Sequence, residues 1–131
     1  MKKIMKEIFS YCRSRGMYVM PSGEKIVVPI VYKSWEFSLT FAPVRKGVLV
    51  TLDTALIFDC DSEFQSKLNA IVMEYEGFCI SLVDEDGEPE IVLQKNIRKG
   101  PCYLHRIMRS AGTMVKTLKL VADFKVKPEE D

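Results

Sequence analysis

The sequence predicts an α+β fold in which helices cover an antiparallel sheet. Apolar residues at helical spacing occupy both ends of the chain, and a regular alternation of apolar and polar residues lies between them. The expected order of elements is α-β-β-β-α-β-β-α, with a turn that can split the first strand in two. From 131 residues, 47% of them apolar and 28% charged, we expect one domain over residues 1–122 and a polar C-terminal tail over 123–131.

The first element is an amphipathic helix that Gly16 can end. Polar residues occupy its other side, so its apolar stripe requires a sheet or a helix to cover it. The stripe consists of Ile4, Met5, Ile8, Phe9 and Cys12.

Two extended runs follow this helix. Residues 17–20 and 25–33 are rich in β-branched and aromatic side chains, and Ser22-Gly23 forms a turn between them. Pro29 lies inside the second run, where a central strand would lack an N–H donor. We therefore expect this strand to lie at an edge or to carry a bulge.

The clearest strand signal lies in residues 35–41, where apolar residues alternate with polar ones. One face of this strand is expected to be buried and the other exposed. The segment from Arg45 to Gly47 predicts a hairpin loop into a further strand over 48–58. Strands joined by such short turns predict an antiparallel meander.

A second helix and a hairpin follow. Residues 61–62 supply a cap for a helix that Gly77 ends, and this segment has the most regular helical stripe in the chain. Residues 78–83 and 90–97 are expected to form strands joined across Asp86-Gly87, a dipeptide suited to a tight turn.

The last helix is expected to start at Pro101, because proline is favoured at the first helical position. Gly112 is the one glycine that lies inside an expected helix. The apolar stripe of this helix consists of Leu104, Ile107, Met108, Ala111, Val115 and Leu118.

Charge is divided into three blocks, although the net charge is only +1. Residues 1–58 carry nine Lys/Arg against four Asp/Glu, residues 59–90 carry one against ten, and residues 91–131 carry nine against four. The overall balance argues against a dedicated nucleic-acid or membrane-surface protein. An acidic block of one copy that faces a basic block of another would suit a homodimer.

The basic last helix and the residues just before it form the candidate interaction surface. No acidic residue occurs between Ile91 and Ala122. A solvated helix face is the simpler interpretation, and contact with phosphates or with an acidic partner is the functional one. The candidate surface consists of Arg98, Lys99, Arg106, Arg109 and Lys116.

No catalytic motif is found, so the candidate for chemistry is the pair Cys102 and His105. Their C-x-x-H spacing would supply two zinc ligands, but no second pair of ligands accompanies it. Cys102 near a helix N-terminus would alternatively be a reactive thiol. In the simpler interpretation Cys102 packs near the helix start and His105 is solvated. We expect no enzymatic activity, no metal site and no cofactor.

The cysteines and the apolar runs indicate a cytoplasmic protein without a membrane partner. No apolar run approaches the length of about eighteen residues that a membrane span needs, and no signal peptide is evident. Four scattered cysteines suit reduced core thiols; these are Cys12, Cys60, Cys79 and Cys102.

The seven methionines, among them Met17, Met20 and Met114, are many for a chain of this length. Core filling explains most of them. The alternative is a methionine-containing groove, because methionine adapts to irregular partners.

The order of elements, the Leu68-Asn69 pair in the middle helix, the turn from Asp84 to Gly87 and the helix that Pro101 leads together resemble the YbjN family of bacterial proteins. The resemblance is topological and spans roughly residues 1–120, whereas Pro29 and the basic last helix depart from it. That family is similar in architecture to type III secretion chaperones. The resemblance implies a non-enzymatic regulator or adaptor that binds protein segments, often as a dimer, and it carries over no site residues.

These observations favour a cytoplasmic protein-interaction module, chaperone-like or regulatory, whose partner is another protein or a second copy of the chain. One alternative is a nucleic-acid-binding domain that uses the basic last helix. The other is a small enzyme that uses Cys102 and His105.

Overall fold

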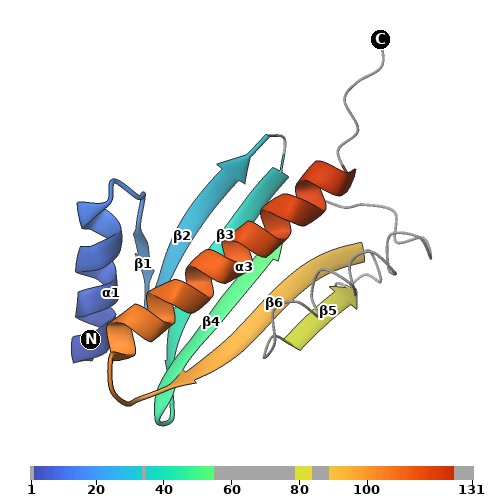
Figure 1. Cartoon of the computed structure of the whole chain (residues 1–131). Coiled ribbons are helices and arrows are strands. Elements are labelled where there is room, and N and C mark those ends of the chain that lie inside the picture. Colours follow the sequence, from blue (N-terminus) through green and yellow to red (C-terminus); the bar gives the residue numbers. More distant parts are fainter. Residues whose placement is uncertain (1, 34, 55–78, 84–88, 126–131) are drawn as a thin grey trace.

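The computed structural model describes residues 2–33, 35–54, 79–83 and 89–125. In this part of the chain the strands form one sheet, and α3 crosses one of its faces (Figure 1). In chain order the elements are α1 (Lys3–Ser14), β1 (Met20–Ser22), β2 (Lys25–Tyr32), β3 (Trp35–Val44), β4 (Gly47–Thr54), β5 (Cys79–Val83), β6 (Pro89–Arg98) and α3 (Tyr103–Lys125).

The sheet is antiparallel throughout, with the strand order β1-β2-β3-β4-β6-β5. The predicted α+β class is confirmed, and the first extended region is split into β1 and β2. Since β6 lies between β4 and β5, the last strand in sequence is inside the sheet. The expected second helix, the end of the run over 48–58 and the turn at Asp86-Gly87 lie outside the described residues.

Gly16 ends α1 as predicted, with a φ of 75°. Its N–H donates to the carbonyl of Arg13 (3.0 Å), and the next N–H, of Met17, donates to the carbonyl of Cys12 (3.1 Å). This pair of bonds is the Schellman arrangement, which requires a left-handed residue at the position of Gly16. The side chains that α1 buries are Met5, Ile8 and Cys12.

The outer half of β2 is an edge of the sheet, as Pro29 led us to expect. β1 pairs only with Lys25 to Val27, and no described strand lies beside β2 after that point. Ser22 pairs with Lys25 on one side of β2, and Tyr32 pairs with Trp35 on the other. With this register, alternation directs the backbone groups of Val28 toward β3 and those of Pro29 and Val31 outward. The missing N–H of Pro29 therefore breaks no ladder bond, and it disfavours the addition of another strand.

Arg45 and Lys46 form the expected hairpin loop between β3 and β4. Gly47, directly after the loop, pairs with Arg98 of β6. A Cβ atom at Gly47 would lie 2.5 Å from the carbonyl oxygen of Ile97. Only glycine permits this close approach, which places the hairpin against the end of β6.

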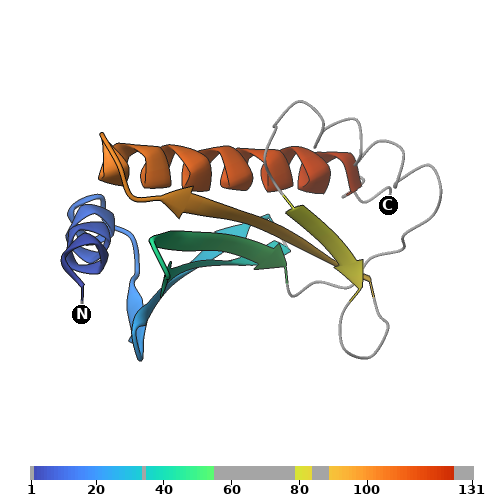
Figure 2. The same cartoon turned by 90° about the horizontal axis from the view of Figure 1, so that it is seen from below.

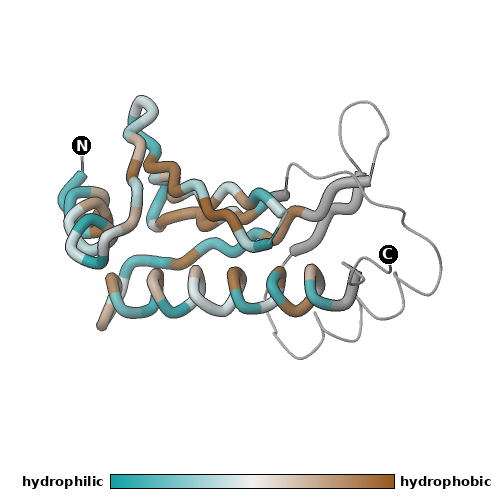
Figure 3. The backbone as a smooth tube through the Cα atoms, turned by 90° about the horizontal axis from the view of Figure 1, so that it is seen from above, coloured by the Kyte–Doolittle hydropathy of each residue, from teal (hydrophilic) through white to brown (hydrophobic). Residues whose placement is uncertain are grey.

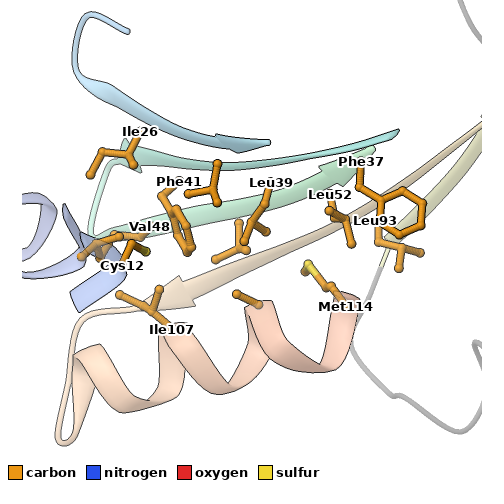
Figure 4. Close-up of a cluster of buried hydrophobic side chains, with 14 of the residues drawn as sticks. Cys12, Ile26, Phe37, Leu39, Phe41, Val48, Leu52, Leu93, Ile107 and Met114 are labelled. Carbon is orange, nitrogen blue, oxygen red and sulfur yellow. The ribbon is translucent and has the colours of Figure 1, made fainter. Parts of the chain in front are cut away.

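The core lies between the sheet and α3 (Figure 4). Helix α3 buries Ile107, Ala111, Met114 and Leu118, which follow one another at i, i+4, i+7 and i+11. The alternation predicted over 35–41 is confirmed, because every second residue faces the helix. The buried apolar residues of β2, β3, β4 and β6 are Ile26, Val28, Trp35, Phe37, Leu39, Phe41, Val48, Val50, Leu52, Leu93 and Ile97.

Helix α3 begins at Tyr103, and the predicted start at Pro101 is wrong by two residues. Cys102 has a φ of 55°, a left-handed conformation that a right-handed helix cannot contain. The side chain of Arg106 holds this connection in place. Its Nε donates to the carbonyl of Pro101 (2.9 Å), and its Nη2 donates to the carbonyl of Arg98 (2.8 Å).

The C-terminal end of α3 is tied to the β2–β3 hairpin through Asp123. This carboxylate accepts a hydrogen bond from the hydroxyl of Tyr32 (2.7 Å) and forms a salt bridge with Lys33. The hydrogen bond from Lys33, followed by that from Tyr32, lowers the pKa of Asp123. Residues 123–125 belong to α3, although the sequence analysis expected them in the polar tail.

The two faces of the sheet differ in what covers them. Helix α3 lies over one face, and α1 lies at the end of the sheet beside the start of α3 (Figure 2). Apolar segments are concentrated in the central strands, whereas polar and apolar segments alternate along β6 and along the turns of α3 (Figure 3). No described helix covers the opposite face, where Gln94 Nε2 donates to Thr51 Oγ1 (3.3 Å) and half-buried Asp53 has a pKa raised by burial. Neither α1 nor α3 is long and apolar enough to cross a membrane.

Candidate functional site

An open apolar groove lies between α1, the outer half of β2 and α3, with a volume of about 580 Å³. The strands form its floor, and the two helices form its walls. We call it the docking groove. It is lined by Tyr11, Arg15, Gly16, Met17 and Tyr18 of α1 and the following link, by Val28, Pro29, Ile30 and Leu39 of the sheet, and by Met108, Ala111, Gly112, Val115 and Lys119 of α3.

The groove exists because the sheet buries only part of the apolar stripe of α3 and leaves one flank of that stripe uncovered. Of the stripe predicted from sequence, Ile107, Ala111 and Leu118 are buried. Met108 and Val115 are only half-buried, and they line the groove. The sequence thus identified the apolar side chains, but it did not show which of them the sheet leaves uncovered.

Large apolar side chains continue the groove onto the surface. Tyr18 is 70% exposed, and Met17 and Met20 are each 41% exposed. Exposed apolar side chains gathered beside a hollow are typical of interaction surfaces. Of the three methionines named in the sequence, Met17 lines the groove, Met20 is exposed outside its lining, and Met114 is fully buried in the core. Met108 is the second methionine of the groove.

Among the residues that line the groove, the charged ones are Arg15 and Lys119, and both are cations. The guanidinium of Arg15 lies 4.4 Å from the centre of the Tyr11 ring, and the ammonium of Lys119 lies 5.2 Å from the centre of the Tyr32 ring. Neither forms a salt bridge within the described residues. The rim of the groove therefore complements acidic groups.

Gly112 lies in the wall of the groove, in the interior of α3. A glycine within a helix costs about 0.5–1 kcal/mol relative to alanine. The fold does not require this glycine, because a Cβ atom built on it meets nothing within 4 Å. Its effect is to leave the helix backbone uncovered at the groove. In the sequence, Gly112 was notable only as a glycine inside the last expected helix.

The five residues of the candidate basic surface lie in two places. Arg98 and Lys99 are exposed at the end of β6 and just after it, whereas Arg109 and Lys116 lie on the exposed face of α3. Arg106 is half-buried, and its guanidinium is bonded to backbone carbonyls and lies 5.7 Å from the Tyr103 ring centre. Arg106 thus shapes the connection before α3. Binding by these five residues stays a prediction.

Cys102 and His105 are both exposed near the start of α3, and neither lines the docking groove. The expectation that Cys102 packs near the helix start as a core thiol is wrong, because its side chain is exposed in the turn before the helix. Cys12 is a core thiol as expected, and burial raises its pKa. The side chains of Cys60 and Cys79 lie outside those that the structure describes.

In the described ranges, no group of three or more His, Cys, Asp or Glu side chains is arranged to hold a metal ion. Cys102 and His105 therefore have no third ligand within this part of the chain. The reactivity of Cys102 remains untested by the geometry.

Comparisons with known proteins support the fold alone. No family model and no curated protein matches the sequence. Among solved structures, the chain is similar to that of YbjN, described as "a putative transcription regulator from E. coli", with a TM-score of 0.65. The match covers 95% of this chain and 96% of that one at 12% sequence identity. The likeness extends over the whole domain, and at this identity it says nothing of shared residues.

Proposed function

We propose that this chain is a non-catalytic adaptor that docks a segment of a partner protein in the groove between α1, β2 and α3. The observation that carries the proposal is an open apolar groove whose wall includes Gly112. The fold has no steric need for glycine at this position. A bound segment that approaches the backbone of α3 would need it, because any side chain there would stand in its way. The exposed side chains of Met17 and Tyr18 enlarge the apolar surface that such a segment would cover.

The chemistry of the groove defines the occupant. Its apolar floor suits a segment with apolar residues on one side, and Arg15 and Lys119 suit acidic residues that flank them. Pro29 disfavours pairing of the segment with the edge of β2, so the segment would rest on side chains instead of extending the sheet. An amphipathic helix with acidic flanks meets all three conditions.

A regulatory role agrees with the description of YbjN as "a putative transcription regulator", because this chain shares the fold of that protein. We place the module in the cytoplasm, where the exposed thiol of Cys102 would stay reduced. A chaperone-like role is a further form of the same proposal, and a homodimer is the alternative to it. In the second case a groove of one copy would receive a segment of another.

The experiment selects binders from a random peptide display library and measures their affinity by fluorescence anisotropy. Gly112→Trp fills the groove from its wall, and Gly112→Ala is the matched control because its methyl group meets nothing. We expect peptides with apolar residues and acidic flanks whose affinity falls at least about tenfold in Gly112→Trp and is little changed in Gly112→Ala. Circular dichroism and light scattering confirm that each variant is folded and report its oligomeric state.

Three outcomes would contradict the proposal. Selected peptides that bind Gly112→Trp as well as the wild type would place the docking site elsewhere. A library that yields no binder while native mass spectrometry shows a small molecule bound to the wild type alone would make the groove a small-molecule site. A dimer that Gly112→Trp converts to a monomer would identify a second copy as the occupant and would replace the partner segment.

A further inference from the structure

A second concave region lies at the other end of α1, where four segments of the chain meet. These are the start of α1, the β3–β4 hairpin, the end of β6 and the connection to α3 (Figures 1 and 2). Two adjoining cavities of about 500 and 480 Å³ share Lys46 and Lys99. We call the region the basic end, and its cations are Lys2, Lys3, Arg45, Lys46, Arg98 and Lys99.

Backbone pairing brings the cations of distant segments together. Gly47 pairs with Arg98, and the N–H of Lys99 donates to the carbonyl of Lys46 (3.0 Å). The absence of a side chain at Gly47 permits this approach of the hairpin to β6. The arrangement is therefore held by the sheet and does not depend on the long side chains themselves.

The positive charge of the basic end is not neutralised within the described part of the chain. Among the described residues that line the two cavities, Glu7 is the one acid. None of the six cations forms a salt bridge with another described residue. Lys2 and Lys3 also lie at the start of α1, where the partial positive charge of the helix end disfavours cations and no side chain caps the backbone. A bound polyanion would offset this repulsion.

We infer that the basic end binds the sugar–phosphate backbone of a nucleic acid. An acidic protein segment would also be attracted, but stable protein interfaces are built around buried apolar anchors. The large apolar side chains that the described surface exposes, such as Met17, Tyr18 and Met20, lie outside the linings of these two cavities. The apolar residues of the linings, Ile4, Val44 and Tyr103, are partly buried, and the six cations around the two adjoining hollows fit a series of phosphates better than an acidic protein segment.

The test compares two variants that each lose one arginine and one lysine. Arg98→Ala/Lys99→Ala removes two cations of the basic end, whereas Arg109→Ala/Lys116→Ala removes two from the exposed face of α3 and is the matched control. Each protein is titrated into fluorescently labelled mixed-sequence DNA and RNA duplexes over a range of salt concentrations. Poly-glutamate of similar charge is the competitor.

We expect the wild type to bind the duplexes at low salt and to lose affinity steeply as salt is added. The Arg98→Ala/Lys99→Ala variant should bind about 10- to 100-fold more weakly at 0.05 M salt, with a logarithmic salt slope smaller by about two. The control should keep most of the affinity. Lys2→Ala/Lys3→Ala should also weaken duplex binding. Because this second variant changes a different segment, the test does not depend on the stability of Arg98→Ala/Lys99→Ala.

Equal losses in the two matched variants would show attraction by net charge alone and would overturn the inference. Undetectable binding by the wild type at low salt would do the same. Displacement by poly-glutamate at concentrations below those of an unlabelled duplex would indicate an acidic protein segment as the partner. Gly112→Trp should leave duplex binding unchanged, so failure of this inference and failure of the docking proposal are distinguishable.

Discussion

The docking groove and the basic end share α1 as a wall, but they are built from opposite kinds of side chain. The C-terminal part of the helix supplies Tyr11 and Arg15 to the groove, and its first turns supply Lys2 and Lys3 to the basic end. The groove depends on apolar surface that the sheet does not cover. The basic end depends on six cations, against which the described part of its lining sets one acid, Glu7.

This difference shows that one fold can leave apolar area uncovered in one region and positive charge uncompensated in another, for separate reasons. Burial of apolar area responds weakly to salt, whereas attraction between exposed charges is screened within a Debye length of about 10 Å at 0.1 M. Binding at the two regions should therefore separate when ionic strength is varied. Variants that damage one region alone, or both together, test whether the comparison is correct.

The largest effect is expected when the shared wall is loosened. Ile8 is fully buried on the inner face of α1, and Ile8→Ala should lower the free energy of unfolding by about 2–5 kcal/mol. Urea denaturation measures this loss. Because α1 contributes to both regions, peptide and duplex binding should weaken together.

Tyr18→Ala is the control for this change, since the side chain is mostly exposed and α1 keeps its packing. Stability should be nearly unchanged in this variant. If Ile8→Ala abolished one binding activity and left the other intact, α1 would not be a common wall.

The next largest effect should separate the two regions. At Gly47 a Cβ atom would approach Ile97 O to 2.5 Å and Asn96 Oδ1 to 2.7 Å, so Gly47→Ala should cost about 1–3 kcal/mol through strain. The hairpin would move away from β6 and duplex binding would weaken, while the groove would keep its shape. Differential scanning calorimetry measures the change in stability.

Gly112→Ala should change stability in the opposite direction from Gly47→Ala. The added methyl group is unobstructed and removes the entropic cost of a helical glycine, so stability should rise by about 0.5–1 kcal/mol. A loss of stability in Gly112→Ala would mean that the fold itself requires this glycine, and the main argument for a groove occupant would fail.

The helix-covered face of the sheet could be predicted, because a strand with one buried face alternates apolar and polar residues along its sequence. The alternation over 35–41 became the buried face of β3, and Gly16 ended α1 as expected. The left-handed residue before α3 could not be predicted, because Pro101 is a good helix start and nothing in Cys102 indicates a positive φ. Its conformation is stabilised by a side chain from the next turn, that of Arg106.

The two candidate sites were less predictable, because both depend on the arrangement of elements in space. A hairpin formed by β5 and β6 can place either strand beside β4, so the approach of Lys99 to Lys46 does not follow from sequence. Likewise, the stripe of α3 contains Met108 and Val115 without indicating which flank stays open. Periodicity identifies the apolar face of an element. Only the packing of the elements shows which part of that face stays exposed.

The smallest expected effect concerns two carboxylates whose pKa values move in opposite directions. Burial raises the pKa of Asp53, so the folded chain binds its proton more tightly and the free energy of unfolding falls as pH rises from 3.8 through the raised value. Asp123 behaves in the opposite way. Its pKa is lowered by hydrogen bonds from Lys33 and Tyr32, so its stabilisation is present above pH 3.8 and is lost as pH falls through the lowered value.

At neutral pH, Asp53→Asn should therefore raise stability slightly, and Asp123→Asn should lower it slightly. Urea denaturation between pH 3 and 7 distinguishes them, because the difference from the wild type should shrink in acid for both variants and have opposite signs at neutral pH. Asp123 bonds to Tyr32, whose ring contacts Lys119 at the groove, so acid should weaken peptide binding more in the wild type than in Asp123→Asn, where only protonation of the peptide's acidic flanks remains. An equal acid effect on peptide binding in both proteins would show that Asp123 does not support the groove rim.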